Sequence, residues 1–299
     1  EREAALVRPS LPALGLDLLP ANGNGRRVVH REPGVALIQG DAREMLELPE
    51  ASVDLVVTDP PFNVSFSDYG GGVKDHVSPE KYAQWTGEWL RECLRVLKPG
   101  GQLYAIMPLK WAPYWLQLVK DQKWHMLAWC KTMAHLHREK TYIRAWEPIL
   151  WVVKGERPNV LRRVYRFHED KDWIIGANAV GESEAVRLKK KHPTPRPDWI
   201  YEYLIIRASE PGMVVLDPMM GSGTGAYVSR KLGRRFVGYD INRTYVELAA
   251  QRLAQAPLDV GEIAEEITGA FRQEELLFKW QVCPEQSRRE SETSQEEES

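Results

Sequence analysis

The chain has 299 residues, of which 43% are hydrophobic and 27% are charged, and its formal net charge at pH 7 is −2. That length can bury the core of one α/β domain with an insertion, and no apolar run or leader suggests a membrane span or a signal peptide, so we expect no membrane partner and a cytoplasmic location. The three cysteines, Cys93, Cys130 and Cys283, show no paired spacing, which argues against a zinc site or a disulfide framework, and we expect no metal.

We expect residues 1–34 to form an N-terminal arm, because Pro, Gly and Asn are scattered through its first 27 residues. The domain proper begins with a predicted strand, Val35–Gln39, which ends at Gly40-Asp41-Ala42. A short helix is predicted from there to Leu48, and Asp41 is a suitable residue to cap it.

The stretch Asp54–Asn63 carries the clearest chemical signal in the chain. An apolar, β-branched run predicts a buried parallel strand, and Asp59-Pro60-Pro61-Phe62 then forms a stiff polar loop at the edge of the sheet. Such a loop suits work on a planar amine. Asp59 and the Pro60 carbonyl can accept hydrogen bonds from the amine, and Phe62 offers a face on which an extruded base can stack. The alternative is a surface turn, because Asp-Pro pairs are common turn formers.

The segment Asn63–Asp75, with Gly70-Gly71-Gly72 at its centre, is a candidate lid over a substrate, with plain disorder as the alternative. Ser78-Pro79 predicts the start of a helix that ends at Leu97, and we assign its aromatic residues to the core. This half of the domain, residues 35–154, continues with a strand, a helix and two more strands, predicted at Leu103–Met107, Lys110–Asp121, Trp124–Lys131 and Pro148–Lys154.

Residues 155–192 break the strand-helix alternation and form an insertion too long for an ordinary loop. Basic residues outnumber acidic ones between residues 131 and 196, and Tyr165, Phe167 and Trp173 lie among them. This composition suits a nucleic-acid-binding face, although a solvated surface insertion would have similar charges. The candidate phosphate contacts are Arg138, Lys140, Arg162, Arg163, Arg166, Lys189 and Lys190.

A second apolar strand, Val214–Leu216, is followed by Asp217-Pro218-Met219-Met220-Gly221-Ser222-Gly223-Thr224-Gly225. Closely spaced glycines let backbone approach a ligand before a helix begins near Ala226. The next strand, Arg235–Tyr239, ends at Asp240, where a carboxylate can accept both hydroxyls of a ribose. The glycine spacing also fits a dinucleotide fingerprint, so an NAD site is a rival, whereas a P-loop is disfavoured because no Lys follows the glycines.

Residues 193–254 form the second half of the domain, with helices predicted at Asp198–Ala208 and Arg243–Leu253. We expect a helical extension over residues 255–283. Residues 284–299 are rich in Glu, Ser and Gln and are expected to be a disordered tail.

Together and in this order, the two loops resemble those of the β group of amino-methylating DNA methyltransferases. In that family a D-P-P-[YF] loop holds the target base and a D-P-F-x-G-S-G-T loop holds S-adenosylmethionine. Met219-Met220 and Gly225 depart mildly from the second pattern. The resemblance covers roughly Val35–Leu253. It implies a Rossmann-like, doubly wound α/β fold with a seven-stranded, mostly parallel sheet whose seventh strand is antiparallel, and a small target-recognition insertion at residues 155–192.

The resemblance also implies site residues. The catalytic residues would be Asp59, Pro60, Pro61 and Phe62. The segment His192-Pro193-Thr194-Pro195-Arg196-Pro197 looks like the family's H-P-[TAS]-x-[KR]-P motif, which contacts the methionine part of the cofactor. Asp41 would then lie beside the cofactor adenine, as an alternative to its capping role. The full set of implied cofactor contacts is Asp41, Ala42, Asp59, Thr194, Arg196, Asp217, Pro218, Met219, Gly221, Ser222, Gly223, Thr224, Asp240 and Ile241.

The implied reaction is methyl transfer from S-adenosylmethionine to the exocyclic amine of a flipped adenine in double-stranded DNA. The same reaction on cytosine is the nearest alternative, but such enzymes more often carry Ser at the position of Asp59. Methylation at a ring carbon needs a cysteine nucleophile, and the only related pair here is the reversed Cys283-Pro284. A non-catalytic nucleic-acid-binding protein on the same fold is a further alternative. A bacterial or phage source, a homodimer and a cognate restriction endonuclease are also compatible with the resemblance.

Overall fold

The computed structural model describes residues 27–63, 76–132, 145–162, 171–176 and 196–255. These residues form one nine-stranded sheet in the order β1-β2-β9-β8-β3-β4-β6-β5-β7. The strands are β1 (Arg27–Glu32), β2 (Val35–Gln39), β3 (Val53–Thr58), β4 (Leu97–Ile106), β5 (Lys123–Lys131), β6 (Trp146–Val153), β7 (Trp173–Gly176), β8 (Val214–Asp217) and β9 (Arg235–Asp240).

The sheet is mostly parallel, as expected, because within it only β1 and β6 run antiparallel to their neighbours. The prediction of seven strands was wrong. The two additional strands, β1 and β7, lie at the two edges of the sheet. The sequence analysis had placed β1 within the N-terminal arm and β7 within the insertion at residues 155–192, where short and partly polar strands gave no distinct pattern.

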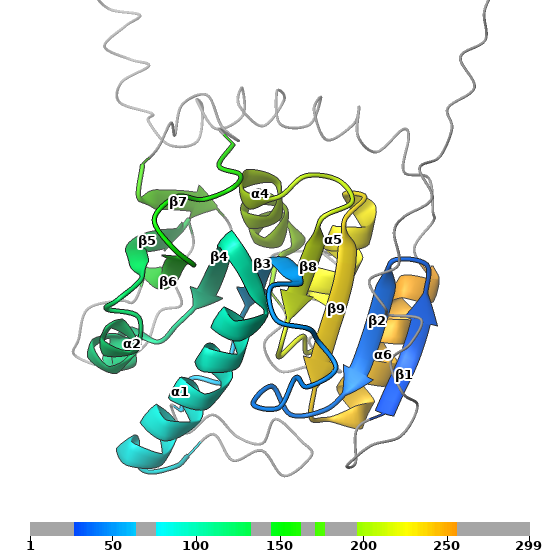
Figure 1. The fold of residues 1–299 in the computed structure, drawn as a ribbon, viewed down its shortest axis with the longest axis horizontal. Coiled ribbons are helices and arrows are strands. Elements are labelled where there is room, and N and C mark those ends of the chain that lie inside the picture. The colour runs from blue at the N-terminus through cyan, green and yellow to red at the C-terminus, as the bar shows by residue number, and fades with distance from the viewer. Residues whose placement is uncertain (1–26, 64–75, 133–144, 163–170, 177–195, 256–299) are drawn as a thin grey trace, which may run out of the picture.

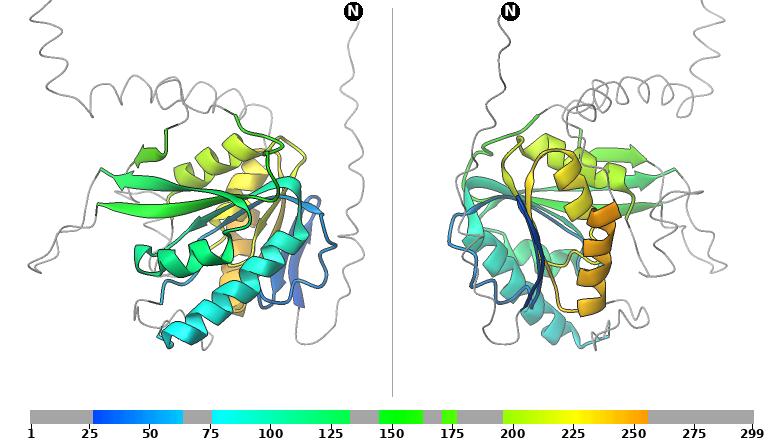
Figure 2. Two further views of the ribbon diagram at one scale, coloured as in Figure 1. Left: turned by 60° about the vertical axis from the view of Figure 1, so that its left-hand side comes forward. Right: turned by 90° about the vertical axis from the view of Figure 1, so that its right-hand side faces the viewer.

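Helices cover both faces of the sheet (Figures 1 and 2). On one face lie α1 (Pro79–Val96) and α2 (Ala112–Leu118), the latter preceded by a 3-10 turn, Leu109–Trp111. On the other face lie α4 (Asp198–Ala208), α5 (Thr224–Lys231) and α6 (Arg243–Gln255). The doubly wound architecture is therefore confirmed.

Two hydrophobic clusters fill the spaces between these layers. Trp89 and Trp115 are fully buried on the side of α1 and α2. Leu204 and Phe236 are fully buried on the side of α4, α5 and α6. All four residues of β8 are buried, which is typical of a central parallel strand covered on both faces.

The connections of the parallel strands place a topological switch point between β3 and β8. The chain leaves β3 and returns to β4 through α1, whereas it leaves β8 and returns to β9 through α5 on the opposite face. From the neighbouring strands β3 and β8, the chain therefore proceeds in opposite directions across the sheet, to β4 on one side and to β9 on the other. Ligands of doubly wound folds bind at the carboxyl ends of strands at such a switch point.

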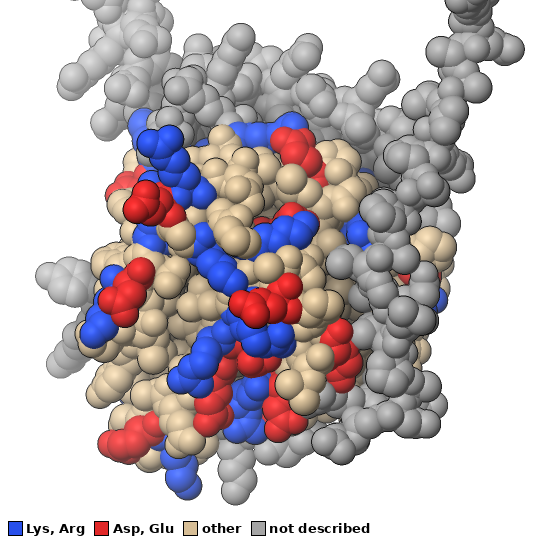
Figure 3. Space-filling model, viewed as in Figure 1, with Lys and Arg blue, Asp and Glu red and all other residues tan. Residues whose placement is uncertain are grey.

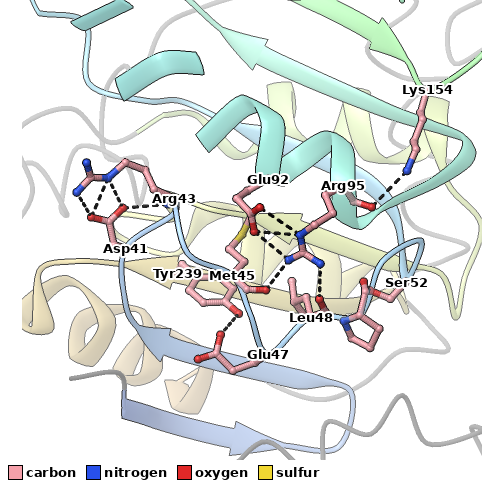
Figure 4. Close-up of polar contacts among 11 residues, drawn as sticks. Asp41, Arg43, Met45, Glu47, Leu48, Ser52, Glu92, Arg95, Lys154 and Tyr239 are labelled. Carbon is pink, nitrogen blue, oxygen red and sulfur yellow. Dashed lines mark hydrogen bonds and ion pairs between the residues drawn. The ribbon is translucent and has the colours of Figure 1, made fainter. Parts of the chain in front are cut away.

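The short helix predicted from Asp41 to Leu48 is absent, because residues 41–50 form turns. The Arg95 guanidinium, on α1, donates to the carbonyls of Met45 and Leu48 at 2.8 and 3.0 Å (Figure 4). Arg95 also forms an ion pair with Glu92 on the same helix at 2.9 Å. Carbonyls held by a distant guanidinium in this way stabilise the turns in place of helical hydrogen bonds.

Two other boundaries differ from the prediction. β4 begins at Leu97, directly after α1, so Lys98-Pro99-Gly100-Gly101 belongs to the strand rather than to a loop. The Gly100 amide donates to the Lys154 carbonyl at 2.7 Å, which extends the pairing with the end of β6. The helix predicted at Lys110–Asp121 is shorter, because α2 ends at Leu118.

Gly223 begins α5 with a left-handed backbone, φ +80°, and a Cβ added there would lie 2.6 Å from the Cβ of Ala249 on α6. We predict that Gly223→Ala lowers the free energy of unfolding by about 3 kcal/mol, as the sum of left-handed strain and overpacking. Gly212→Ala is the matched control, since Gly212 has φ +83° with nothing within 4 Å of the added Cβ. It should cost only about 1 kcal/mol. Equal losses in urea unfolding would contradict the close contact with α6.

Candidate active site

Four aspartates lie at the carboxyl ends of four neighbouring parallel strands. In the order of the sheet these strands are β2, β9, β8 and β3. The corresponding carboxylates belong to Asp41, Asp240, Asp217 and Asp59. Because the carboxyl ends of parallel strands meet at one edge, residues from opposite ends of the chain converge here. The sequence analysis had named all four.

Asp217 is almost fully buried, with 1% of its surface exposed. Its Oδ1 accepts a hydrogen bond from the Met219 amide at 3.1 Å, and its Oδ2 lies 3.5 Å from the Tyr201 hydroxyl. Burial raises the pKa of Asp217 to about 7. This carboxyl therefore exchanges its proton near neutral pH.

Asp240 uses both carboxylate oxygens to hold the backbone of neighbouring loops. Oδ2 accepts from the Gly221 amide at 3.0 Å, and Oδ1 accepts from the Asn242 amide at 2.8 Å. Burial raises the pKa of Asp240 to about 6. Each oxygen keeps a second lone pair, so the carboxylate can still accept from a ligand hydroxyl. Ile241, the next residue, has 49% of its surface exposed.

The glycine loop packs too tightly for side chains at several positions. Gly221 has φ +50°, and a Cβ on Gly225 would lie 3.2 Å from the Asp217 Oδ2. Ser222 and Thr224 are buried, and the Thr224 hydroxyl accepts from Nη1 of Arg252 at 3.0 Å. The loop from Pro218 and Met219 onward thus brings backbone close to the two buried carboxylates. The approach of this backbone to a ligand stays a prediction.

The Asp41 carboxylate forms an ion pair with Arg43 at 2.7 Å and also accepts from the Arg43 amide. Arg43 in turn pairs with Glu88 on α1 at 3.1 Å. The two acids raise the pKa of Arg43 further above its ordinary value, despite partial burial. Asp41 caps a turn rather than a helix, which corrects the capping interpretation. Ala42 beside it is buried.

The Asp59-Pro60-Pro61-Phe62 loop is held by side chains from α1 and from the turn before α2. The Tyr82 hydroxyl donates to the Pro61 carbonyl and Nε1 of Trp111 donates to the Phe62 carbonyl, each at 3.1 Å. None of the hydrogen bonds among the described residues uses the Pro60 carbonyl. The two residues that follow Pro60 are therefore held in place, and the Pro60 carbonyl remains as an acceptor.

Asn63 ends this loop with a left-handed backbone, φ +52°. Its amide group pairs with the backbone of Val77, accepting at 2.8 Å and donating at 3.0 Å. Most of the candidate lid, Asn63–Asp75, lies outside the described residues, which omit residues 64–75. Sequence reasoning missed the roles of Tyr82, Trp111 and Asn63. Tyr82 was assigned to the core with the other aromatic residues of its helix, and no role was predicted for Trp111.

Arg196 contacts Asp59. Its Nε and Nη2 donate to Oδ2 and Oδ1 of Asp59 at 2.6 and 2.9 Å, a bidentate arrangement. Its Nη1 lies 2.8 Å from Oε2 of Glu147, and Glu147 also pairs with Lys131. The guanidinium carbon lies 5.6 Å from the ring centroids of both Phe62 and Trp129.

Asp59, Arg196, Glu147 and Lys131 thus form a chain of alternating charges, which we call the ion-pair ladder. Within it, each residue shifts the pKa of its neighbours. Burial raises the pKa of Asp59, and the facing Arg196 opposes that rise. Burial alone would lower the pKa of Arg196, but the carboxylates of Asp59 and Glu147 outweigh it and hold that pKa above its ordinary value. For Glu147, the two cations outweigh burial and lower the pKa. Sequence reasoning gave no signal for Glu147 or Lys131.

Most of the predicted nucleic-acid contacts fall outside the described residues. They are Arg138, Lys140, Arg163, Arg166, Lys189 and Lys190, and the cofactor candidate Thr194 is outside as well. Arg162 is described and forms an ion pair with Glu210. On the face drawn in Figure 3, the described basic and acidic side chains are interspersed.

Within the described part of the chain, no group of three or more His, Cys, Asp and Glu side chains could hold a metal ion. No helix in that part is long and apolar enough to cross a membrane.

Residues 53–251 match the protein family described as DNA methylase. The chain belongs to this family. It is 33% identical over 228 residues to the type II methyltransferase M.HpaI of Haemophilus parainfluenzae, a match that covers 71% of each protein. It is 26% identical over 253 residues to the DNA adenine methyltransferase YhdJ of Escherichia coli K12, over 73% of this chain and 82% of that protein.

Solved structures share the fold of this DNA methylase. The PvuII DNA methyltransferase, which is cytosine-N4-specific, superposes with a TM-score of 0.62 at 19% identity, over 80% of this chain and 92% of the other. M1.HpyAVI in complex with S-adenosylmethionine superposes with a TM-score of 0.57 at 22% identity, over 73% of this chain and 98% of the other. The resemblance inferred from the two loops is thus confirmed, and the protein is an S-adenosylmethionine-dependent DNA methyltransferase.

The buried carboxylates predict how cofactor affinity depends on pH. S-adenosylmethionine carries a positive sulfonium, so a cofactor site that includes Asp217 and Asp240, as the resemblance implies, should bind it more tightly when both carboxyls are ionised. Because their pKa values are about 7 and about 6, affinity should fall as the pH is lowered from 8 to 6, by about tenfold. Asp217→Asn should bind more weakly at pH 8 and keep only the smaller step of Asp240. Calorimetric titration at the two pH values measures this, and a wild-type affinity independent of pH would contradict it.

Proposed function

We propose that this enzyme methylates the exocyclic amine of adenine in double-stranded DNA after flipping the base out of the duplex. The observation that carries the proposal is Asp59, a buried carboxylate paired with Arg196 at the carboxyl ends of β3 and β8. An aromatic amine is a poor nucleophile, and a fixed anionic acceptor is the group that can orient and polarise it.

The residues at this edge fit the cofactor. S-adenosylmethionine supplies an electrophilic methyl group when bound. The carboxylates of Asp217 and Asp240 suit its positive charge and its hydroxyls, and the glycine loop allows close approach of backbone. We propose that Asp41, Ala42, Thr194, Pro218 to Thr224, Asp240 and Ile241 complete the cofactor site. Asp240 would take the ribose and Ile241, which is exposed, would pack on the adenine.

The chain's own residues act on the base as follows. Asp59 and the Pro60 carbonyl accept hydrogen bonds from the two N–H groups of the amine, which directs its lone pair toward the methyl group. Phe62 stacks on the extruded base and offsets part of the few kcal/mol that unstacking costs. Tyr82 and Trp111 keep the loop rigid by holding the adjacent carbonyls. The proton released after transfer leaves from the amine to Asp59 or to water.

Adenine is favoured over cytosine by two observations. The loop carries Asp59 where cytosine-amine enzymes more often carry Ser, and YhdJ, named an adenine methyltransferase, is 26% identical over most of this chain. The cytosine-N4-specific PvuII enzyme, at 19% identity, supports the shared fold alone. A non-catalytic role on the same fold is disfavoured because the described loop and its supporting hydrogen bonds are intact.

The domain divisions and partners follow as proposals. Residues 155–192 would recognise the target sequence, flanked by the catalytic half at residues 35–154 and the cofactor half at 193–254. Residues 1–34 would form an arm, 255–283 a helical extension and 284–299 a tail. A homodimer and a cognate restriction endonuclease are compatible partners, and we propose that the enzyme acts in the cytoplasm of a bacterium or of a phage-infected cell.

The reaction is tested by incubation with unmethylated genomic DNA and S-adenosylmethionine, followed by nucleoside mass spectrometry. We expect N6-methyladenine from the wild type. Asp59→Ala should lose at least about a hundredfold in turnover, because the acceptor that orients the amine is gone, while cofactor affinity changes little. Methylated cytosine amine would overturn the base assignment. Full activity of the variant would remove Asp59 from its role.

The DNA contacts are tested by the salt dependence of binding. If Arg162 and Arg163 touch phosphates, replacing both with Gln should reduce the slope of log affinity against log salt by about 2, one per lost contact. Arg43→Gln is the control, since Arg43 is an exposed arginine paired within the domain. An unchanged slope in the double variant would place the pair away from DNA, with Arg162 serving only its ion pair with Glu210.

A further inference from the structure

The ladder of four alternating charges beside Phe62 is more than the chemistry of the amine requires. Its members are Asp59, Arg196, Glu147 and Lys131. They come from the loop after β3, the residue two before α4, the start of β6 and the end of β5. The side chains of Asp59, Arg196, Glu147 and Lys131 are only 14 to 16% exposed. Burying charges to this extent is costly even when they are paired, because desolvation can exceed the gain from pairing, so the arrangement calls for a functional explanation.

The pairing of β5 and β6 fixes the end of the ladder that is formed by Glu147 and Lys131. Glu147 lies opposite Trp129 in the antiparallel register of β5 and β6. Directly opposed residues project from the same face of a sheet, and Lys131, two residues after Trp129, projects from that face too. Trp129 contacts Trp199 of α4 edge to face, with ring centroids 5.9 Å apart. Glu147 and Lys131 are thus held by rigid strands on the face that α4 covers.

At the other end of the ladder, Asp59 keeps free acceptor positions for a substrate amine. Arg196 uses one lone pair on each oxygen of Asp59, and a carboxylate offers about four acceptor positions in all. Two positions remain for the hydrogens of an amine. The rigid fork of a guanidinium also fixes the carboxylate plane, which a single point charge would not do. Arg196 is itself fixed by Glu147 and by the flanking rings of Phe62 and Trp129.

We propose that Arg196 and Glu147 are positioning residues for methyl transfer: Arg196 sets the plane and the negative charge of Asp59, and Glu147 sets Arg196. This inference rests on the proposed function, in which Asp59 accepts hydrogen bonds from the target amine. It also replaces the role that the sequence motif suggested for Arg196, which was contact with the methionine part of the cofactor.

The first test reads Asp59 directly and does not depend on methyl transfer. The protein is labelled with carboxyl-¹³C aspartate, Asp59 is assigned by comparison with Asp59→Asn, and its carboxyl resonance is titrated. The charged and titratable groups that influence Asp59 are Arg196, Glu147, Lys131, Tyr201 and Asp217. Arg196→Gln removes the closest cation and should raise the pKa of Asp59. Glu147→Gln removes a like charge and should lower it.

The second test measures turnover against pH at saturating cofactor and DNA. The acidic limb of kcat should move to higher pH in Arg196→Gln and to lower pH in Glu147→Gln. At the optimum, kcat should fall about a hundredfold in the first and about tenfold in the second, with KM for S-adenosylmethionine nearly unchanged. Arg196→Lys should restore the position of the limb, because it restores the charge, but not the full kcat, because it lacks the fork.

Glu202→Gln is the matched control. Glu202 on α4 is 15% exposed and pairs with Lys231 at 2.8 Å, so its replacement removes a similarly buried ion pair away from the ladder. In this variant, the pKa of Asp59 and the acidic limb of kcat against pH should both stay as in the wild type. Thermal unfolding of all variants checks that each is folded at the temperature of the assays.

Three results would overturn the inference. An Asp59 titration unmoved by both Arg196→Gln and Glu147→Gln would leave the ladder a structural feature only. Faster turnover in Arg196→Gln would mean that the guanidinium occupies the place of the base and must leave it. Unchanged kcat with a raised KM for the cofactor would return Arg196 to a cofactor contact. If the titration shifts as expected but the wild type methylates no base, the positioning role stands and the proposed function fails.

Discussion

The convergence of four carboxylates at one edge of a parallel sheet is the constraint on which the site depends. Parallel strands must end on the same side, so Asp41, Asp240, Asp217 and Asp59 are brought together by the topology itself. Like charges in a crowded and partly dry environment destabilise one another and shift toward their neutral forms. The amides and guanidinium groups that contact these four aspartates therefore compensate negative charge.

The compensation differs between the two halves of the site. Asp217 and Asp240 are met by backbone amides of Met219, Gly221 and Asn242, which carry only partial charges. Their pKa values accordingly lie at about 7 and about 6. Asp59 is met instead by the full charge of a guanidinium. A cationic ligand can neutralise the negative charge of Asp217 and Asp240. The Asp59 carboxylate instead has its counter-charge, Arg196, before any ligand binds.

Sequence patterns located most of the fold because its signals are local. Helix α4 has the predicted limits because Pro197 precedes it and Ser209 ends it in an extended conformation. The strands before Asp59 and Asp217 were found from their apolar runs. The helix predicted at residues 41–48 failed because Arg95, from a distant helix, holds the carbonyls there. The edge strands β1 and β7 were missed because strands at an edge can be short and polar.

The same distinction between local and distant signals explains the site. A motif reports which residue types follow one another, so it located the loop of Asp59 and the segment of Arg196. It does not report which side chain lies opposite a residue on a neighbouring strand. Glu147 reaches Arg196 only because the register of β5 and β6 places it opposite Trp129. Since Lys131 ends β5 and Glu147 lies near the start of β6, the segment connecting these strands begins and ends at the ladder. The end of the ladder formed by Glu147 and Lys131 is therefore built by strand pairing, which a sequence motif does not encode.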